Sequence, residues 1–280
     1  MDQPRWRQVL SLAALACAAI SGCQGGAPKP GQSESVLDLF APPSPAEAAA
    51  WAVDPFDPDK RQRGLLLLAN APFGGENVYV RLYAVAATDE DAGVRAVAMR
   101  ALSLHGGPDN VPLIAGQLTD REESELVRRE AAHALQRLHN TAAIPALIQA
   151  IDPAREEDMD VRARAARALG QYAEPRVVRS LINALNDRRL VVNQNARDSL
   201  QVLTGQDFRY NARAWTEWMN SSSDVFALRG EYEYPVFQRD PTIVEFLTPF
   251  WSPPNESPAK PVGMPVGSDT AAADPEKGGE

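Results

Sequence analysis

The sequence predicts an all-α protein, an α-solenoid of about five helical hairpins between disordered N- and C-terminal flanks. Three ten-residue stretches carry this prediction, because they repeat almost the same pattern at nearly equal intervals. They are VRAVAMRALS from Val94, VRREAAHALQ from Val127 and VRARAARALG from Val161. Self-similarity at a period of about 34 residues is typical of proteins in which each repeat packs only on its neighbours.

Each stretch has the apolar spacing of a helix. In the third, Val161, Ala165, Ala168 and Leu169 fall at i, i+4, i+7 and i+8, on one face. A second segment with helical spacing follows each stretch after a turn. These second segments begin at Val111, Ile144 and Val178. Neither helix of a unit can bury its apolar face alone, so stacked units are expected to share one continuous core.

Weaker copies extend the array at both ends, at nearly the same period. KRQRGLLLL begins at Lys60, before the first strong copy, and VNQNARDSL begins at Val192, after the last. The helix boundaries agree with this reading. Asp91 and Asp158 stand three positions before a repeat valine and are expected N-caps. Pro112 and Pro145 follow the first residue of a second helix, where proline is tolerated.

The repeat V-R-x-x-A/G-x-x-A-L resembles HEAT repeats, in particular the short HEAT-like repeats of bacterial proteins and phycobilin lyases. The resemblance covers residues 58–204. It implies that the arginine after the valine pairs with an acidic residue of an adjacent unit, which applies here to Arg95, Arg128 and Arg162. Residue 193 is an asparagine, so the series of pairs is expected to lapse there.

Residues 1–22 have the organisation of a bacterial signal peptide. Arg5 and Arg7 precede an apolar run from Val9 to Ile20, which is too short to span a bilayer stably. The run ends in Ile-Ser-Gly-Cys, which resembles the lipobox of bacterial lipoproteins. The resemblance implies that Cys23 is acylated and becomes the first residue of the mature chain. An ordinary secretory signal with an incidental cysteine is the alternative.

Lipidation would anchor the protein to the cell envelope through two or three acyl chains, palmitate among them, because one chain gives marginal binding. By resemblance, Gln24 after the cysteine permits sorting to the outer membrane, facing the periplasm, rather than retention in the inner membrane. Residues 23–57 read as a Pro/Gly/Ala-rich tether. One short helix is expected in it, because Ser44 and Glu47 have the spacing of a capping box.

Residues 205–251 are expected to form a C-terminal cap and an aromatic extension. TGQDFRYNARAWTEWMN, from Thr204, resembles a segment that closes some bacterial HEAT-repeat proteins. Asn211 can begin a helix that places Trp215 and Trp218 over the last unit, although a tryptophan pair can also form a ligand platform. Residues 224–251 either pack on the solenoid or dock on a partner. Residues 252–280 lack hydrophobic periodicity and are expected to be disordered.

No catalytic or metal-binding pattern is apparent in the sequence. His105, His133 and His139 have no partner at a recurring catalytic or metal-ligand spacing. The acidic pairs of residues 122–123, 156–157 and 158–160 fall in expected inter-repeat loops beside arginines, and we expect them to be solvated. The sequence therefore predicts a protein that is not an enzyme and holds no cofactor or metal.

Charge excludes one class of partner. Residues 59–204 hold 19 acidic and 19 basic side chains, and the whole net charge of −9 comes from the flanks. Nucleic-acid binding needs a basic surface, so it is not expected. Two function classes remain: a membrane-anchored, monomeric scaffold for protein–protein interaction, and a lyase- or chaperone-like protein that acts on a modified protein or small ligand. The second rests on fold resemblance alone.

For the scaffold, the outward positions of the second helices are the expected contact points for a protein or peptide partner. These positions are Gln117, Gln149, Arg179 and Asn183. A closed pocket that holds a histidine or a buried carboxylate would favour the enzyme, and an open, shallow groove would favour the scaffold.

Overall fold

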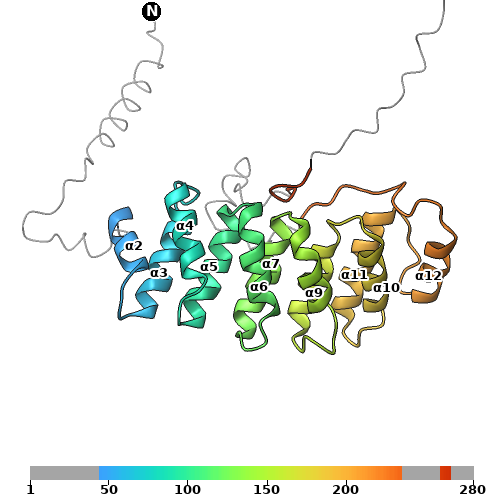
Figure 1. The fold of residues 1–280 in the computed structure, drawn as a ribbon, viewed down its shortest axis with the longest axis horizontal. Coiled ribbons are helices and arrows are strands. Elements are labelled where there is room, and N and C mark those ends of the chain that lie inside the picture. Colours follow the sequence, from blue (N-terminus) through green and yellow to red (C-terminus); the bar gives the residue numbers. More distant parts are fainter. Residues whose placement is uncertain (1–43, 235–258, 266–280) are drawn as a thin grey trace, which may run out of the picture. The chain divides into compact units, whose positions relative to one another are not determined.

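The computed structural model describes residues 44–234 and 259–265, which belong to the second of two units of the chain, Ser44–Glu280. These residues form eleven α-helices and two short 3-10 helices. Figure 1 shows how the helices follow one another along the stack. The first part comprises α2 (Pro45–Ala52), α3 (Pro58–Ala69), α4 (Asn77–Ala86), α5 (Ala92–His105), η2 (Pro108–Asn110), α6 (Val111–Thr119) and α7 (Glu125–Arg137). The second comprises η3 (Thr141–Ala143), α8 (Ile144–Ala150), α9 (Met159–Leu169), α10 (Pro175–Ala184), α11 (Leu190–Thr204) and α12 (Ala212–Ser221).

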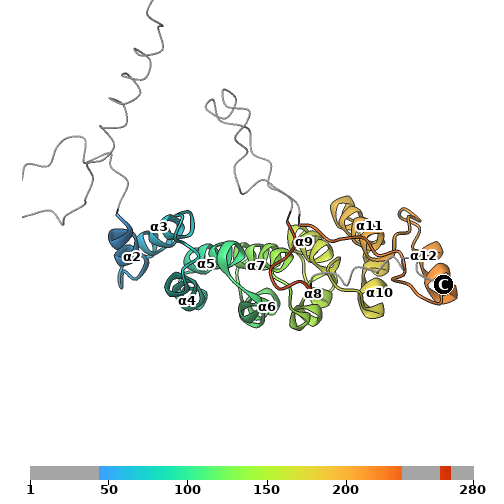
Figure 2. The same cartoon turned by 90° about the horizontal axis from the view of Figure 1, so that it is seen from above.

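The α-helices stack in two rows, which Figure 2 shows from above. The first helices of the units, α3, α5, α7, α9 and α11, pack in succession in one row. The second helices, α4, α6, α8, α10 and α12, form the other row. The prediction of an all-α solenoid of about five helical hairpins is therefore confirmed.

Local sequence signals determine where the helices begin. The Asp91 carboxylate accepts a hydrogen bond from the Val94 N–H at 2.9 Å, and Asp158 accepts one from the Val161 N–H at 2.9 Å. Both residues are the N-caps that the sequence predicted, and they satisfy amide donors that a helix start leaves unpaired. Pro112 and Pro145 lie in the first turn of α6 and α8, as expected.

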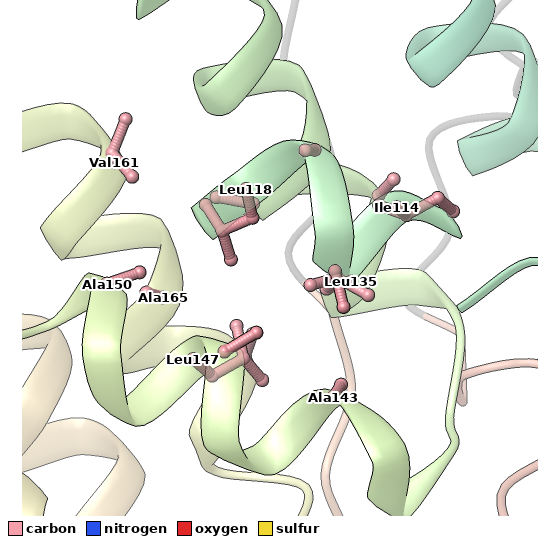
Figure 3. Close-up of a cluster of buried hydrophobic side chains, with 14 of the residues drawn as sticks. Ile114, Leu118, Leu135, Ala143, Leu147, Ala150, Val161 and Ala165 are labelled. Atoms are coloured by element: carbon pink, nitrogen blue, oxygen red, sulfur yellow. The ribbon is translucent and has the colours of Figure 1, made fainter. Parts of the chain in front are cut away.

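The core is a continuous layer of aliphatic side chains between the rows, part of which Figure 3 shows. Leu118 of α6, Leu135 of α7 and Leu147 of α8 point toward one another and are at most 2% exposed. Alanine occupies the seams between first helices, because Ala131 and Ala165 are fully buried there. Each buried leucine contributes about 1.5–3 kcal/mol relative to an exposed one, so stacking stabilises helices that are too short to be stable alone.

The helix expected within the 23–57 segment is α2, and it packs against α3. Ser44 and Glu47 form the predicted capping box, with the Ser44 N–H 2.8 Å from the Glu47 carboxylate. The two helices approach very closely at Gly64, where an added Cβ would lie 2.3 Å from the backbone nitrogen of Ala52. Glycine at the seam position of this first unit therefore lets α2 take its place on the N-terminal end of the first-helix row.

The C-terminal chain returns along the ends of the first helices after α12. The Gly230 N–H bonds the Val202 carbonyl at 2.7 Å, Arg229 bonds the Gln171 carbonyl at 2.9 Å, and Tyr232 is buried. Residues 222–234 thus pack on the solenoid. Of the two alternatives for the segment 224–251, the structure shows packing on the solenoid for the described residues 224–234, and the rest lies outside them.

Residues 259–265 also pack on the solenoid, although the sequence predicted disorder from residue 252. Val262 forms a parallel bridge with Leu138, in which its N–H bonds the Arg137 carbonyl and its carbonyl accepts from the His139 N–H, both at 2.8 Å. Gly263, with a φ of 84°, lies against Pro108, where an added Cβ would be 2.3 Å from the ring. The prediction of disorder is wrong for this segment, because backbone pairing holds an extended segment that has no hydrophobic period of its own.

Candidate functional site

A ladder of buried ion pairs runs along the loops that follow the second helices. Each ladder arginine comes from a first helix, and its acidic partner precedes the next first helix. The pairs are Arg61–Asp89 at 2.8 Å, Arg95–Glu123 at 2.6 Å, Arg128–Glu156 at 2.8 Å and Arg162–Asp187 at 2.8 Å. The resemblance correctly implied the last three pairs with the adjacent unit, and it missed the first.

The same arginines also bond backbone carbonyls of the loop before their own helix. Arg128 donates to the Glu123 carbonyl while its guanidinium also binds Glu156, and Arg162 donates to the Glu156 carbonyl at 3.0 Å. Glu156 is thus held by two arginines, one at its side chain and one at its backbone. At Asn193 the series ends, as predicted, because its amide donates to a backbone carbonyl at 3.0 Å rather than to a carboxylate.

The acidic pairs in these loops are not simply solvated, which corrects the sequence interpretation. Glu123 and Glu156 are 7% and 5% exposed and paired, and Asp158 caps α9 and binds Arg129. Burial alone would raise the pKa of Glu123, but the Arg95 guanidinium and the Ser124 N–H outweigh it, and the pKa lies below its ordinary value. The ladder therefore fixes the loops on which the neighbouring cavities are built.

The loop of residues 151–158 connects α8 to α9, and two cavities lie beside this loop. This loop is longer than the other loops that connect a second helix to the next first helix in the described chain. One cavity, of about 350 Å³, lies between this loop and the end of α6 and is lined mainly by polar residues, among them Arg121, Gln149 and Glu157. The other, of about 390 Å³, lies between the loop and α10 and is lined by Ile148 and Asn183 among others.

Both cavities are hollows in the surface, because Arg121, Glu157 and Asn183 in their walls are exposed. No histidine lines either cavity. Glu156 is a buried carboxylate in the wall of the first, but its oxygens bond Arg128 and the Asp158 N–H. The loop of residues 151–158 thus forms a ridge with one hollow on each side, which we call the loop ridge.

The four predicted contact residues lie in three different environments. Gln149 and Asn183 each line one of the two hollows beside the loop ridge. Arg179 is exposed on α10, and the structure places it in neither hollow. Gln117 is half-buried on α6 and bonds the Ala87 carbonyl of the preceding unit at 2.9 Å, which joins two repeats.

The tryptophan pair lies on α12, whose first turn is capped by Asn211. Trp215 is fully buried, and its indole N–H bonds the Arg209 carbonyl at 3.0 Å. Phe208 packs edge-on against Trp215 at 5.0 Å, and Trp218 packs edge-on against Trp215 at 6.1 Å. α12, which carries the pair, packs against α10, the preceding second helix.

The histidines occupy three separate places. His105 Nε2 bonds the Ala69 carbonyl at 2.7 Å, and His139 stacks on Tyr172 at 4.9 Å. His133 lies on α7, with Nδ1 3.9 Å from Glu130. Among residues 44–234 and 259–265 there is no group of three or more His, Cys, Asp or Glu residues that could hold a metal ion. No helix of this part of the chain is long and apolar enough to cross a membrane.

Comparison with known protein families identifies the type of repeat in this chain. A family model for HEAT repeats matches residues 79–156 and 117–201. The chain contains HEAT repeats. Two engineered proteins of known structure are similar to this HEAT-repeat chain, each with a TM-score of 0.46. No curated protein matches it.

The first of these structures is the designed armadillo repeat protein YIII(Dq)4CqI, with 18% identity over 66% of this chain and 94% of that chain. The second is an engineered protein from the Northeast Structural Genomics Consortium, with 20% identity over 63% of this chain and 96% of that chain. The HEAT-repeat match begins within α4 and ends within α11, so it includes the loop ridge and both hollows.

Sequence reasoning located the second-helix surface but missed the loop ridge. Two sequence features indicated this loop: the turn-forming pair Asp152-Pro153 and the acidic pair Glu156-Glu157. Both glutamates line the first hollow, and Glu156 is also buried and paired in the ladder. The nearly constant repeat period hides the longer loop, because α8 is shorter than the other second helices by about the same amount.

Proposed function

We propose that this protein is a non-enzymatic scaffold for protein–protein interaction, anchored to the bacterial cell envelope by lipid on Cys23. HEAT-repeat proteins are typically protein-binding scaffolds, and the loop ridge supports that role here. The anchor is supported by the order of basic residues, apolar run and Ile-Ser-Gly-Cys at the N-terminus. Gln24 supports an outer-membrane location facing the periplasm.

The loop ridge is the observation that carries the binding role. A loop between two hollows of about 350 and 390 Å³ can interlock with side chains of a partner on both sides. The buried pairs Arg128–Glu156 and Arg162–Asp187 hold both sides of the ridge in place. The loop therefore loses little conformational entropy when a partner binds. Preorganised loops on a rigid body are where binding residues of proteins concentrate.

Photocrosslinking in bacterial cells tests the binding role. A benzoylphenylalanine placed at Gln149 or Asn183 is expected to capture the same partner from both hollows. The matched control is Arg213 on α12, which is 88% exposed and lines neither hollow. The capture from Gln149 is expected to fall at least several-fold when Asn183 is replaced with arginine, since a long charged side chain fills the second hollow.

Equal capture of the partner by a crosslinker at position 213 would refute the proposal. Capture from position 149 that is unchanged by the Asn183→Arg replacement would also refute it. Capture of a small molecule instead of a protein would favour the lyase- or chaperone-like alternative. The volume of the first hollow lies within the range of small-ligand sites, and its wall is polar.

Processing of the N-terminus tests the anchor separately. Replacing Cys23 with alanine is expected to leave an uncleaved precursor that takes up no alkyne-labelled palmitate, because the thiol that accepts the lipid is gone. Replacing Cys17 with alanine is the matched control and is expected to leave labelling and cleavage unchanged. Labelling is read by gel fluorescence and cleavage by intact mass. Normal processing of the Cys23→Ala variant would show that the anchor is misassigned.

A further inference from the structure

A row of basic residues crosses the face of the first helices, away from the loop ridge. Arg100 of α5, His133 of α7 and Arg167 of α9 each stand six positions after the repeat valine of their helix. Because α5, α7 and α9 pack side by side in succession, these equivalent positions lie next to one another. The repeat therefore places three basic side chains in one line across three units.

Two more arginines join this row. Arg137 lies one helical turn after His133 on α7, and Arg164 lies one turn before Arg167 on α9. Arg137 stacks on the ring of Tyr234 with its guanidinium carbon 4.6 Å from the ring centre. We call the five residues the arginine face: Arg100, His133, Arg137, Arg164 and Arg167.

Among the described residues, the arginine face has little negative charge beside it. In the described part of the chain, none of its four arginines lies within ion-pair distance of a carboxylate. Arg167 bonds a neutral amide oxygen of Asn195 at 3.3 Å. A single carboxylate of the described chain, that of Glu130, lies within ion-pair distance of His133, 3.9 Å from its ring nitrogen.

The positive charge of the arginine face contributes to a lowered pKa of His133. Burial, together with the positive charges of Arg164, Arg137 and Arg100, lowers the pKa of His133 to about 4. His133 is therefore neutral at pH 7, and the positive charge of the face comes from its four arginines.

The helices α5, α7 and α9 supply both the arginines of the ladder and those of the arginine face, but the two groups differ in their partners. Arg95, Arg128 and Arg162 each have a buried carboxylate partner. Among the described residues, the arginines of the arginine face have no such partner, so their mutual repulsion costs free energy unless an anion is bound. Guanidinium groups bind carboxylates in a bidentate geometry, and a row along three units suits an extended segment.

We propose that the arginine face binds an acidic peptide segment of a partner protein. A membrane surface fits less well, because few large apolar side chains lie beside the basic ones to insert into the bilayer and add to the electrostatic attraction of lipid headgroups. The exposed large apolar residues of α7 and α9 are Leu126 and Met159, which lie at the N-terminal ends of these helices, away from the face. This surface is distinct from the loop ridge and does not depend on the function proposed for it.

The test uses the full chain in detergent and a fluorescein-labelled oligoglutamate peptide, with fluorescence anisotropy as the readout. Each of Arg100→Gln and Arg164→Gln is expected to weaken binding about two- to fivefold, the usual range for a partly exposed ion pair. Glu130→Gln is expected to strengthen binding by a similar factor, because it removes a competing negative charge beside His133. Arg213→Gln, on α12 and paired with Glu217, is the matched control and is expected to change nothing.

A second readout does not depend on the variants. Nuclear magnetic resonance of the histidine rings follows His133 directly, because the chain holds only three histidines. Saturating oligoglutamate is expected to raise the pKa of His133 above about 4, since bound carboxylates offset the part of the shift that comes from the arginine charges. His139, which lies outside the arginine face, is the internal control, and its pKa is expected not to change on peptide binding.

Three results would overturn the assignment. The first is oligoglutamate binding that is equally strong in the Arg100→Gln/Arg164→Gln double variant with native circular dichroism. The second is an unchanged pKa of His133 at saturating peptide. The third is mutation-sensitive binding to phosphatidylglycerol vesicles without binding of the peptide, which would make the face a lipid-contact surface instead.

Discussion

Replacing Arg162 with methionine is expected to lower the free energy of unfolding by about 3–5 kcal/mol, the usual cost of breaking a buried ion pair. The change leaves the Asp187 carboxylate without its guanidinium partner, and the Asp187 side chain is only 2% exposed. It also removes the donor to the Glu156 and Glu157 carbonyls. Urea denaturation followed by circular dichroism measures the difference.

Two further variants separate pairing from packing. Arg213→Met, which breaks the exposed pair with Glu217, is expected to cost less than about 1 kcal/mol. Combining Arg162→Met with Asp187→Leu is expected to restore most of the lost stability, since no buried charge remains unpaired. If Arg162→Met unfolds at the same urea concentration as the unmodified protein, the ladder does not stabilise the stack.

Replacing Trp215 with alanine is expected to cost about 3–5 kcal/mol, as for other large-to-small changes in a core. Trp215 is fully buried, contacts the rings of Phe208 and Trp218, and bonds the Arg209 carbonyl, so its removal leaves a cavity and an unpaired backbone group. α12 covers α10, so hydrogen exchange should increase first in these two helices.

Tyr210 supplies the matched control for Trp215. It lies in the turn before α12 and is 45% exposed, with Arg197 over its ring at 6.0 Å. Tyr210→Ala is expected to cost about 1 kcal/mol or less. Equal losses from the two variants would mean that α12 is held by its surface contacts rather than by the buried indole.

The repeated architecture was predictable because one pattern serves every unit. Val127 and Ala131 are buried for the same reason as Val161 and Ala165, and each copy of the pattern strengthens the interpretation of the others. The ladder pairs of Arg95, Arg128 and Arg162 were implied by the resemblance to HEAT repeats. Arg61 was missed because its unit begins with lysine in place of valine.

The features that were missed depend on tertiary contacts or on single departures from the pattern. Nothing in the composition of residues 259–265 indicates that Val262 pairs with Leu138, since such pairing needs only backbone groups. The hollows beside the loop ridge arise where the loop of residues 151–158 is longer than its counterparts. The arginine face emerges only when helices are placed next to one another, because its members come from three different repeats.

The return of the C-terminal chain to α7 has a consequence for folding during synthesis. A stack of repeats can ordinarily form unit by unit as it leaves the ribosome, because its contacts are local in the chain. Here Arg137 meets Tyr234 across 97 residues, and Leu138 meets Val262 across a still longer separation. The contacts of the C-terminal end of α7 are therefore completed only after Val262 has been synthesised, and until then this end of the helix stays uncovered.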